Sequence, residues 1–295
     1  SIPAKILNFL KIFFGFISAK LVFINSGNRY FINFKTDIKI IKNIKFRNFL
    51  VKVKINNFWD FWRTKNYESH PVGIIIDEKN KSQNEKIIFY EIGANIGYSS
   101  ILVSKVLHKS DRVYCFEIEP TNFKTLTDNI ILNKLTNVIP LNIGISSKNL
   151  ISKLFYNTVF NNDKDFLPQS GQGSHSITFD KKLHKKDVLS YVPLMTFNSI
   201  ISTFNLELPT HIYVDAYGAE IEIIKSILSS NYYSNIKKII VDIEDDTKNL
   251  EDTKVYKMLL DKDFIVDTNK SEYNVGIGTN DNVHFTVFKN NKLSS

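Results

Sequence analysis

Short apolar runs alternate with segments of helical periodicity between residues 85 and 288. The runs are rich in β-branched and aromatic residues, which is typical of strands buried in a parallel sheet. Because strands and helices follow one another in turn, the pattern favours βαβ units and an α/β fold. The predicted strands span 87–90, 113–117, 137–143, 210–215 and 237–243, and the predicted helices span 98–107, 221–228 and 253–260, with a further helix that begins at Pro120.

Two regions depart from this alternation. Residues 146–196 contain one strand-like run, 154–156, within polar and turn-rich sequence. Loops of this kind, held over a rigid sheet, commonly carry substrate contacts. At the end of the chain, 264–267 and 283–288 have the pattern of a closing antiparallel pair. We therefore predict a sheet that is mostly parallel and whose last strands reverse direction.

Residues 1–84 are predicted to form a helical and β-containing appendage, and residues 85–295 the main domain. Apolar residues at helical spacing give residues 2–23 one apolar face. Packing on the main domain is the favoured use of this face, and peripheral contact with a membrane is the alternative. The rest of the appendage is predicted to hold strand-like runs at 30–34 and 51–55 with a basic connection between them, an aromatic cluster at 58–62 that packs on the core, a helical segment at 72–77 and a polar loop at 78–85.

The segment YEIGANIGYSS follows the first predicted strand and leads into a helix. Gly93 and Gly97 allow a sharp turn that exposes amide N–H groups at the helix N-terminus. Glu91 would repel a pyrophosphate, but it can accept hydrogen bonds from amino or hydroxyl groups. The turn thus favours a nucleoside that lacks phosphates and carries a positive charge, as S-adenosylmethionine does. The predicted cofactor-binding residues here are Glu91, Gly93, Ala94, Asn95, Gly97 and Tyr98.

Two further acids are predicted to reach the same edge of the sheet. Glu117 closes the second strand 20 residues after Gly97, a spacing at which a strand-terminal acid meets ribose hydroxyls in βαβ nucleotide folds. Asp215 closes the fourth strand, so three carboxylates would surround a cationic ligand. Methyl transfer depends mainly on placement, and deprotonation of the acceptor adds to the rate. Asp215 is the best-placed acid for orienting or deprotonating an acceptor.

From about residue 59 to the C-terminus the chain resembles the FkbM-type S-adenosylmethionine-dependent methyltransferases. Its segments YEIGANIGYSS, VYCFEIEPTNF and IYVDAYGAEIEIIKS are similar to the family wording D-x-G-A-N-I-G, F-E-P-x-P and K-x-D-x-E-G-A-E. The resemblance implies a Rossmann-like class I methyltransferase fold, with a seven-stranded, mostly parallel sheet and helices on both faces. It also implies O-methylation of a hydroxyl on a sugar, glycan or secondary metabolite. Glu68 matches the glutamate of a family segment that precedes the first core helix. The departures are Glu91 for Asp, Ile118 for Pro, and Tyr213 and Tyr217 for the Lys and Glu around Asp215.

Five more residues are candidates for contacts with cofactor or acceptor. Methyltransferases of this architecture often place the end of the third strand near the adenine, which makes Asn142 a candidate. His175 has an ordinary pKa that suits a general base, and the alternative is an exposed loop histidine. Tyr217 can stack on a ring or bind a hydroxyl, whereas Glu220 lies in a first helical turn, where an acid is favoured whatever its function. Glu244 follows the fifth strand and is predicted to reach the substrate side of the same cleft.

Composition narrows the function classes. The net charge is +8, but lysine is spread through a sequence equally rich in Asn, Ile and Phe, so no nucleic-acid partner is predicted. The single cysteine, Cys115, excludes an internal disulfide and fits a cytoplasmic compartment. No Cys-x-x-Cys or His-Glu-x-x-His motif is present, so no metal is predicted. The oligomeric state is left open.

The main alternative is a methyltransferase-like binding or scaffold protein that has lost catalysis, and Tyr213 and Tyr217 motivate it. A nicotinamide-dependent oxidoreductase would carry G-x-G-x-x-G without an acid in the first turn. A nucleic-acid methyltransferase would carry an Asn-Pro-Pro-Tyr-like or Pro-Cys motif after the fourth strand, where this chain has Asp215-Ala216-Tyr217-Gly218. The sequence therefore favours an S-adenosylmethionine-dependent O-methyltransferase with a small-molecule or glycan acceptor.

Overall fold

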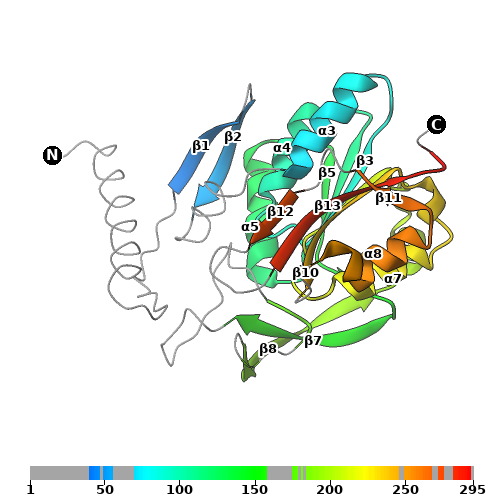
Figure 1. Cartoon of the computed structure of the whole chain (residues 1–295). Helices are drawn as coiled ribbons and strands as arrows, with labels where there is room; N and C mark the ends of the chain where they lie inside the picture. The colour runs from blue at the N-terminus through cyan, green and yellow to red at the C-terminus, as the bar shows by residue number, and fades with distance from the viewer. Residues whose placement is uncertain are drawn as a thin grey trace.

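A computed structural model describes residues 40–46, 49–55, 70–157, 175–178, 181, 184–245, 249–267, 272–275 and 282–293. At its centre lies an eight-stranded sheet with the order β11-β13-β10-β9-β3-β4-β5, in which β12 also pairs with β13, along the edge that faces away from β10 (Figure 1). The strands are β3 (Ile88–Ile92), β4 (Arg112–Phe116), β5 (Val138–Leu141), β9 (His211–Val214), β10 (Lys238–Asp245), β11 (Phe264–Val266), β12 (Glu272–Val275) and β13 (Asn282–Asn290).

The direction of these strands confirms the predicted fold class. Parallel pairing joins five of the strands, β10, β9, β3, β4 and β5. In contrast, β13 is antiparallel to both β10 and β11. The chain crosses from β5 back to β9, on the other side of β3, so the strand order changes direction beside β3. In open α/β sheets, ligands bind at the carboxyl ends of the strands next to such a switch point. The architecture is an α/β fold with a mostly parallel, Rossmann-like sheet whose last strands reverse direction.

Helices cover both faces of the sheet. One face carries α3 (His70–Lys81), α4 (Tyr98–Val106) and α5 (Pro120–Leu132), whose apolar residues form one hydrophobic cluster with Phe89 and Val113. The other face carries α6 (Phe197–Phe204), α7 (Glu220–Leu228) and α8 (Lys254–Leu260), which form a second cluster with Tyr90 and Ile212. Alternate strand residues thus supply two cores, as burial on both faces requires.

The described part of the predicted appendage is a hairpin and a helix. β1 (Ile40–Phe46) and β2 (Phe49–Ile55) pair as an antiparallel ribbon, which Figure 1 shows in blue beside the helices. The expected strand at 51–55 is confirmed, but 40–46 is a strand rather than a basic connection, and it pairs with β2 along its whole length. α3 extends to Lys81, so the loop predicted for 78–85 is shorter. The predictions for 2–23, 30–34, 58–62 and Glu68 lie outside the described residues, and the boundary at residue 84 stays a prediction.

Residues 144–195 include a second sheet that the sequence pattern did not predict. β6 (Gly144–Ile145), β8 (His184–Met195) and β7 (Leu150–Asn157) form it in that order, with β8 antiparallel to β7. The run at 154–156 is confirmed as part of β7. The long strand β8 was missed because charged residues at its start hide the β-prone residues that follow. None of the helices in the described ranges is long and apolar enough to cross a membrane.

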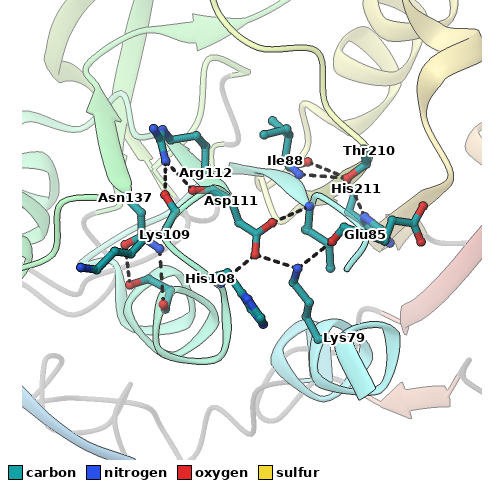
Figure 2. A network of polar contacts seen from close by, with 12 residues as sticks. Lys79, Glu85, Ile88, His108, Lys109, Asp111, Arg112, Asn137, Thr210 and His211 are labelled. Atoms are coloured by element: carbon teal, nitrogen blue, oxygen red, sulfur yellow. Dashed lines mark hydrogen bonds and ion pairs between the residues drawn. The ribbon is translucent and has the colours of Figure 1, made fainter. Parts of the chain in front are cut away.

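A polar network fastens the amino ends of the central strands (Figure 2). Asp111, just before β4, is 0% exposed and accepts hydrogen bonds from the backbone N–H groups of Ile87 and His108 at 2.8 and 2.7 Å. The ammonium of Lys79, from α3, lies 2.8 Å from Oδ2 of Asp111, the oxygen that also accepts from His108, and donates to the carbonyl of Glu85 at 2.6 Å. This network ties α3 to the starts of β3 and β4.

Candidate active site at the carboxyl edge of the sheet

The turn between β3 and α4 has an unusual backbone. Gly93, Asn95 and Gly97 adopt φ angles of 91°, 51° and 78°, in the left-handed region that glycine and asparagine tolerate best. The N–H groups of Gly93 and Ala94 both donate to the carbonyl of Phe116 at the end of β4, at 2.9 and 3.0 Å. The turn is therefore fixed to the neighbouring strand before any ligand binds.

Close packing explains why two of these positions are glycine. A Cβ on Gly93 would lie 1.9 Å from the backbone carbonyl oxygen of Asp215, and a Cβ on Gly97 would lie 2.2 Å from Cδ1 of Leu126. The turn is thus pressed between the end of β9 and helix α5. Tyr98, the first residue of α4, is buried behind it, and burial raises the pKa of its hydroxyl.

Glu91 faces the interior rather than open solvent. Its side chain is 2% exposed and accepts a hydrogen bond from the hydroxyl of Ser100, to which the Cys115 thiol donates in turn at 2.9 Å. Burial raises the pKa of Glu91 to about 8, and the nearby carboxylates of Asp215 and Glu117 add to the rise. The direct cofactor contact predicted for Glu91 stays a prediction, although its charge lies beside the two other strand-end acids.

Glu117 links the end of β4 to the turn. One carboxylate oxygen accepts from the N–H of Asn95 at 2.7 Å, and the other accepts from the N–H of Glu119 at 2.7 Å. Burial raises the pKa of Glu117 to about 7, although these backbone hydrogen bonds favour the ionised form. Because each carboxylate oxygen has two lone pairs, both can still accept from ligand hydroxyls. Asn142 lies at the same place, since its side-chain amide donates to the Glu117 carbonyl at 2.7 Å.

The ends of β9 and β10 bring together an acidic pair and a tyrosine. The Tyr213 hydroxyl donates to a carboxylate oxygen of Asp242 at 3.0 Å and lies 3.5 Å from one of Asp215. Tyr213 is 2% exposed, so its ring belongs to the core while its hydroxyl meets the two acids. Asp242 was not predicted as a site residue. Its signal was available, because it is the one acid inside an otherwise apolar run, IIVDI.

Glu220 approaches the same acids from the first turn of α7. It is 4% exposed, and its carboxylate accepts from the N–H of Gly218 at 3.1 Å. Burial raises the pKa of Glu220 to about 8, and the charges of Asp215 and Asp242 raise it further. Tyr217 is half-buried in the turn before it. For Glu244, the backbone lies in β10, whereas its side chain is outside the described part of the chain.

The segment around His175 lies beside this edge. Ser176 pairs with Phe155 of β7 through two backbone hydrogen bonds, and its hydroxyl lies 3.8 Å from the place that a Cβ on Gly218 would occupy. The His175 ring packs edge-on against Tyr156, with 5.2 Å between ring centroids. The histidine is half-buried rather than fully exposed. Its predicted role as a base stays a prediction.

The carboxyl edge as a whole is an acidic site with a fixed turn. Within the described residues, no group of three or more His, Cys, Asp or Glu side chains is arranged to hold a metal ion. Carboxylates gathered at the ends of parallel strands suit a cationic ligand. The sulfonium and amino groups of S-adenosylmethionine are cationic, and its ribose hydroxyls are donors, so the residues present fit this cofactor. The acids that the structure brings together are Glu91, Glu117, Asp215, Glu220 and Asp242.

Comparison with known proteins finds a family model that matches part of the chain. Residues 76–165 match the model of the TRM5/TYW2 methyltransferase domain, a segment that contains the turn and Glu117. No curated protein matches the chain. Among solved structures it is similar to M. jannaschii TYW2 in complex with AdoMet, at 15% identity over 88% of each chain with a TM-score of 0.42. It is also similar to precorrin-6y C5,15-methyltransferase from Geobacter metallireducens GS-15, at 14% identity over 74% of this chain and 88% of that chain with a TM-score of 0.39.

The fold, the site and the matched segment point to one class of protein. Its central sheet is mostly parallel, and the matched segment carries the glycine turn, Glu117 and Asn142, whereas Asp215, Glu220 and Asp242 lie outside it. These findings support a methyltransferase that uses S-adenosylmethionine.

Proposed function

We propose that the chain is an S-adenosylmethionine-dependent O-methyltransferase whose acceptor is a hydroxyl of a small molecule or glycan. The observation that carries the proposal is the convergence of Glu117, Asp215 and Asp242 on one edge of the sheet, beside a glycine turn that is fixed in advance. A site of this charge would repel a pyrophosphate-bearing nicotinamide cofactor. The FkbM-type motifs in the sequence support a hydroxyl acceptor.

Each part of the site has a distinct task in this proposal. Glu117 and Asn142 hold the nucleoside, and the turn at 93–97 supplies backbone groups that approach it closely. When bound, S-adenosylmethionine supplies a methyl group on a positively charged sulfur, which becomes a neutral thioether on transfer. Because the charge of the donor falls during the reaction, most of the acceleration comes from placing the acceptor oxygen in line with the methyl group.

Asp215 is proposed as the residue that orients the acceptor hydroxyl and takes its proton, with His175 as the second candidate for this base. Tyr213 and Asp242 support the choice of Asp215, since the Tyr213 hydroxyl lies between the two carboxylates and fixes their spacing. Tyr217, Glu220 and Glu244 are proposed to contact the acceptor. Neither a nucleic acid nor a metal is part of the proposal.

Calorimetric titration with S-adenosylhomocysteine tests cofactor binding, and a separate titration with NAD tests the nicotinamide alternative. We expect micromolar binding of S-adenosylhomocysteine, no heat with NAD, and at least a tenfold loss of affinity in Glu117→Ala, about 1.4 kcal/mol. Glu207→Ala is the matched control, because Glu207 lies at the opposite edge of the sheet, partly exposed beside Lys86. No binding by folded wild-type protein would overturn the proposal.

Transfer of a labelled methyl group then separates an enzyme from a binding protein. With glycans and other hydroxyl acceptors, the proposal expects incorporation that Asp215→Asn lowers while S-adenosylhomocysteine still binds. Cofactor binding without transfer to any acceptor would favour the scaffold protein that has lost catalysis. Transfer to RNA in place of hydroxyl-bearing small molecules would contradict the proposed acceptor class.

A further inference from the structure

Asn129, in α5, connects two segments that are distant in the sequence. Its side chain is 0% exposed. The amide oxygen accepts from the backbone N–H of Lys54 in β2 at 2.8 Å, and the amide nitrogen donates to the backbone carbonyl of Ile96 in the glycine turn at 3.0 Å. A buried amide with both ends engaged fixes the two groups that it joins, because losing either bond would leave a buried polar group unsatisfied.

The same face of α5 supports the turn at a second point. Leu126 precedes Asn129 by three residues, so the two side chains lie next to each other on the helix. Leu126 fills the space beneath Gly97, where a Cβ would come within 2.2 Å of it. Asn95, just before Ile96, is in the left-handed conformation with φ 51°. The turn therefore depends on contacts from α5 for a backbone shape that non-glycine residues rarely adopt.

The outer edge of β2 is hydrogen-bonded to asparagine side chains in and at the end of the same helix. Asn133 accepts from the N–H of Lys52 at 2.9 Å and donates to the Lys52 carbonyl at 2.6 Å. Four residues along a helix advance about 6 Å, and two residues along a strand advance about 6.6 Å. The pair Asn129 and Asn133 therefore matches the outward N–H groups of Lys54 and Lys52. Of the two asparagines, Asn129 is the one that also bonds to the turn.

We propose that Asn129 is a positioning residue that couples the β1–β2 hairpin to the cofactor turn. With the hairpin docked, the amide is held by Lys54 and presents its nitrogen to the Ile96 carbonyl, which keeps the turn in its binding shape. The N-terminal hairpin thus contributes to cofactor affinity without touching the ligand, since a turn that is already ordered loses less entropy on binding. The affinity part of this inference rests on the proposed function; the coupling itself does not.

Hydrogen exchange of the ligand-free protein tests the coupling directly. The reporters are the backbone N–H groups of Ile96 and Gly97, which are bonded within the turn at 2.9 and 2.8 Å. We expect Asn129→Ala to raise their exchange at least tenfold, and Asn133→Ala to leave it within twofold although β2 loses bonds in both variants. Equal acceleration in the two variants, or none in Asn129→Ala, would overturn the proposal.

A second pair of variants leaves α5 intact, in case Asn129→Ala does not fold. Lys54→Pro removes the N–H that Asn129 accepts and also the ion pair of the Lys54 ammonium with Asp128, which Asp128→Asn removes while keeping that N–H. Lys52→Pro removes the N–H that Asn133 accepts. Proline is tolerated on an outer strand edge. Only Lys54→Pro is expected to accelerate exchange in the turn, and the same response from Lys52→Pro would contradict the coupling.

Titration with S-adenosylhomocysteine tests whether the coupling through Asn129 affects cofactor affinity. Asn129→Ala is expected to bind at least tenfold more weakly than wild type, while Asn133→Ala stays within twofold. If the wild-type protein does not bind, the proposed function fails and the exchange experiment still decides the coupling. If it binds and Asn129→Ala binds equally well, the proposed function stands and the positioning role fails.

Discussion

Buried acids lie at both edges of the central sheet, but their surroundings differ. At the amino edge, Asp111 has a buried cation, Lys79, at 2.8 Å and two backbone N–H donors (Figure 2). At the carboxyl edge, Glu91, Glu117 and Glu220 are equally buried, yet within the described part of the chain no ion pair involves any of them. Burial raises their pKa values to about 8, 7 and 8.

The two edges therefore serve different ends. A buried ion pair with its hydrogen bonds satisfied is compensated within the protein, and breaking it destabilises the fold. A group of buried acids without a cation is destabilised when ionised and gains from a positively charged ligand. The amino edge fastens α3 to the sheet, whereas the carboxyl edge carries buried acids whose ionised forms a cationic ligand would stabilise. Substitutions at each edge can test this division.

The largest expected effect is at the amino edge. Asp111→Ala leaves the buried ammonium of Lys79 without its partner and two buried backbone N–H groups without an acceptor. We expect the free energy of unfolding to fall by about 3–5 kcal/mol, measured by urea denaturation. Lys86→Ala is the control. Lys86 pairs with Glu207 at the protein surface, and exposed ion pairs contribute about 1 kcal/mol or less to stability. Similar losses in the two variants would remove the distinction between the network and a surface pair.

Gly93→Ala should cost nearly as much at the carboxyl edge. The new Cβ would lie 1.9 Å from the Asp215 carbonyl oxygen at a φ of +91°, so we expect a loss of about 3 kcal/mol from strain and overpacking. Gly218→Ala separates the two causes, since Gly218 has a φ of +75° but a new Cβ there would meet only an ordinary contact, the Ser176 hydroxyl at 3.8 Å. That variant should lose only about 1 kcal/mol. Equal losses would mean that the turn is not pressed against β9.

Much of this architecture follows from sequence pattern. Buried parallel strands such as 87–90 and 113–117 are continuous apolar runs, and the turn between them needs glycines, so the βαβ unit and its edge were predictable. The strand β8 was not, because the lysines and histidine at its start resemble a solvated loop. Its partners in the second sheet come from distant parts of the chain, and pairing of that kind leaves no local periodicity.

The site was predictable to the extent that it lies at strand ends. Glu117 and Asp215 meet at the expected edge because parallel strands end together. Asp242 was missed because it lies inside a predicted strand, where an acid breaks the apolar pattern without marking an end. Tyr213, in place of the Lys of the FkbM-type wording, motivated the alternative of lost catalysis, which stays a prediction. Its hydroxyl contacts both acids, which the motif did not predict. A contact between two strands that a helix separates in the sequence cannot be read from either strand alone.

The pH dependence of stability tests the raised pKa values of the buried acids at the carboxyl edge. Glu220 has a folded pKa of about 8, above the unfolded value of about 4.3. The folded protein therefore binds more protons than the unfolded chain between these values, and stability falls as pH rises through this window. Between pH 6.5 and 8, the wild type should lose about 2 kcal/mol relative to Glu220→Gln, at about 1.4 kcal/mol per pH unit. Urea denaturation at both pH values measures this difference, and parallel profiles would contradict the raised pKa.

His211 provides the matching test at the amino edge. It is 2% exposed, its Nδ1 lies 2.9 Å from the Thr210 hydroxyl, and burial lowers the pKa of the imidazole to about 4. The unfolded chain, with a pKa of about 6.5, binds the proton first as pH falls, so stability decreases from pH 6.5 toward 4. Between pH 6.5 and 5.5 the wild type should lose about 1 kcal/mol relative to His211→Leu, measured by urea denaturation at the two pH values. Glu220 lowers the stability of the protein as pH rises, and His211 lowers it as pH falls. Opposite slopes in the two difference profiles would therefore assign each pH range to its own edge of the sheet. Slopes of the same sign would show that the two edges titrate as one charge system.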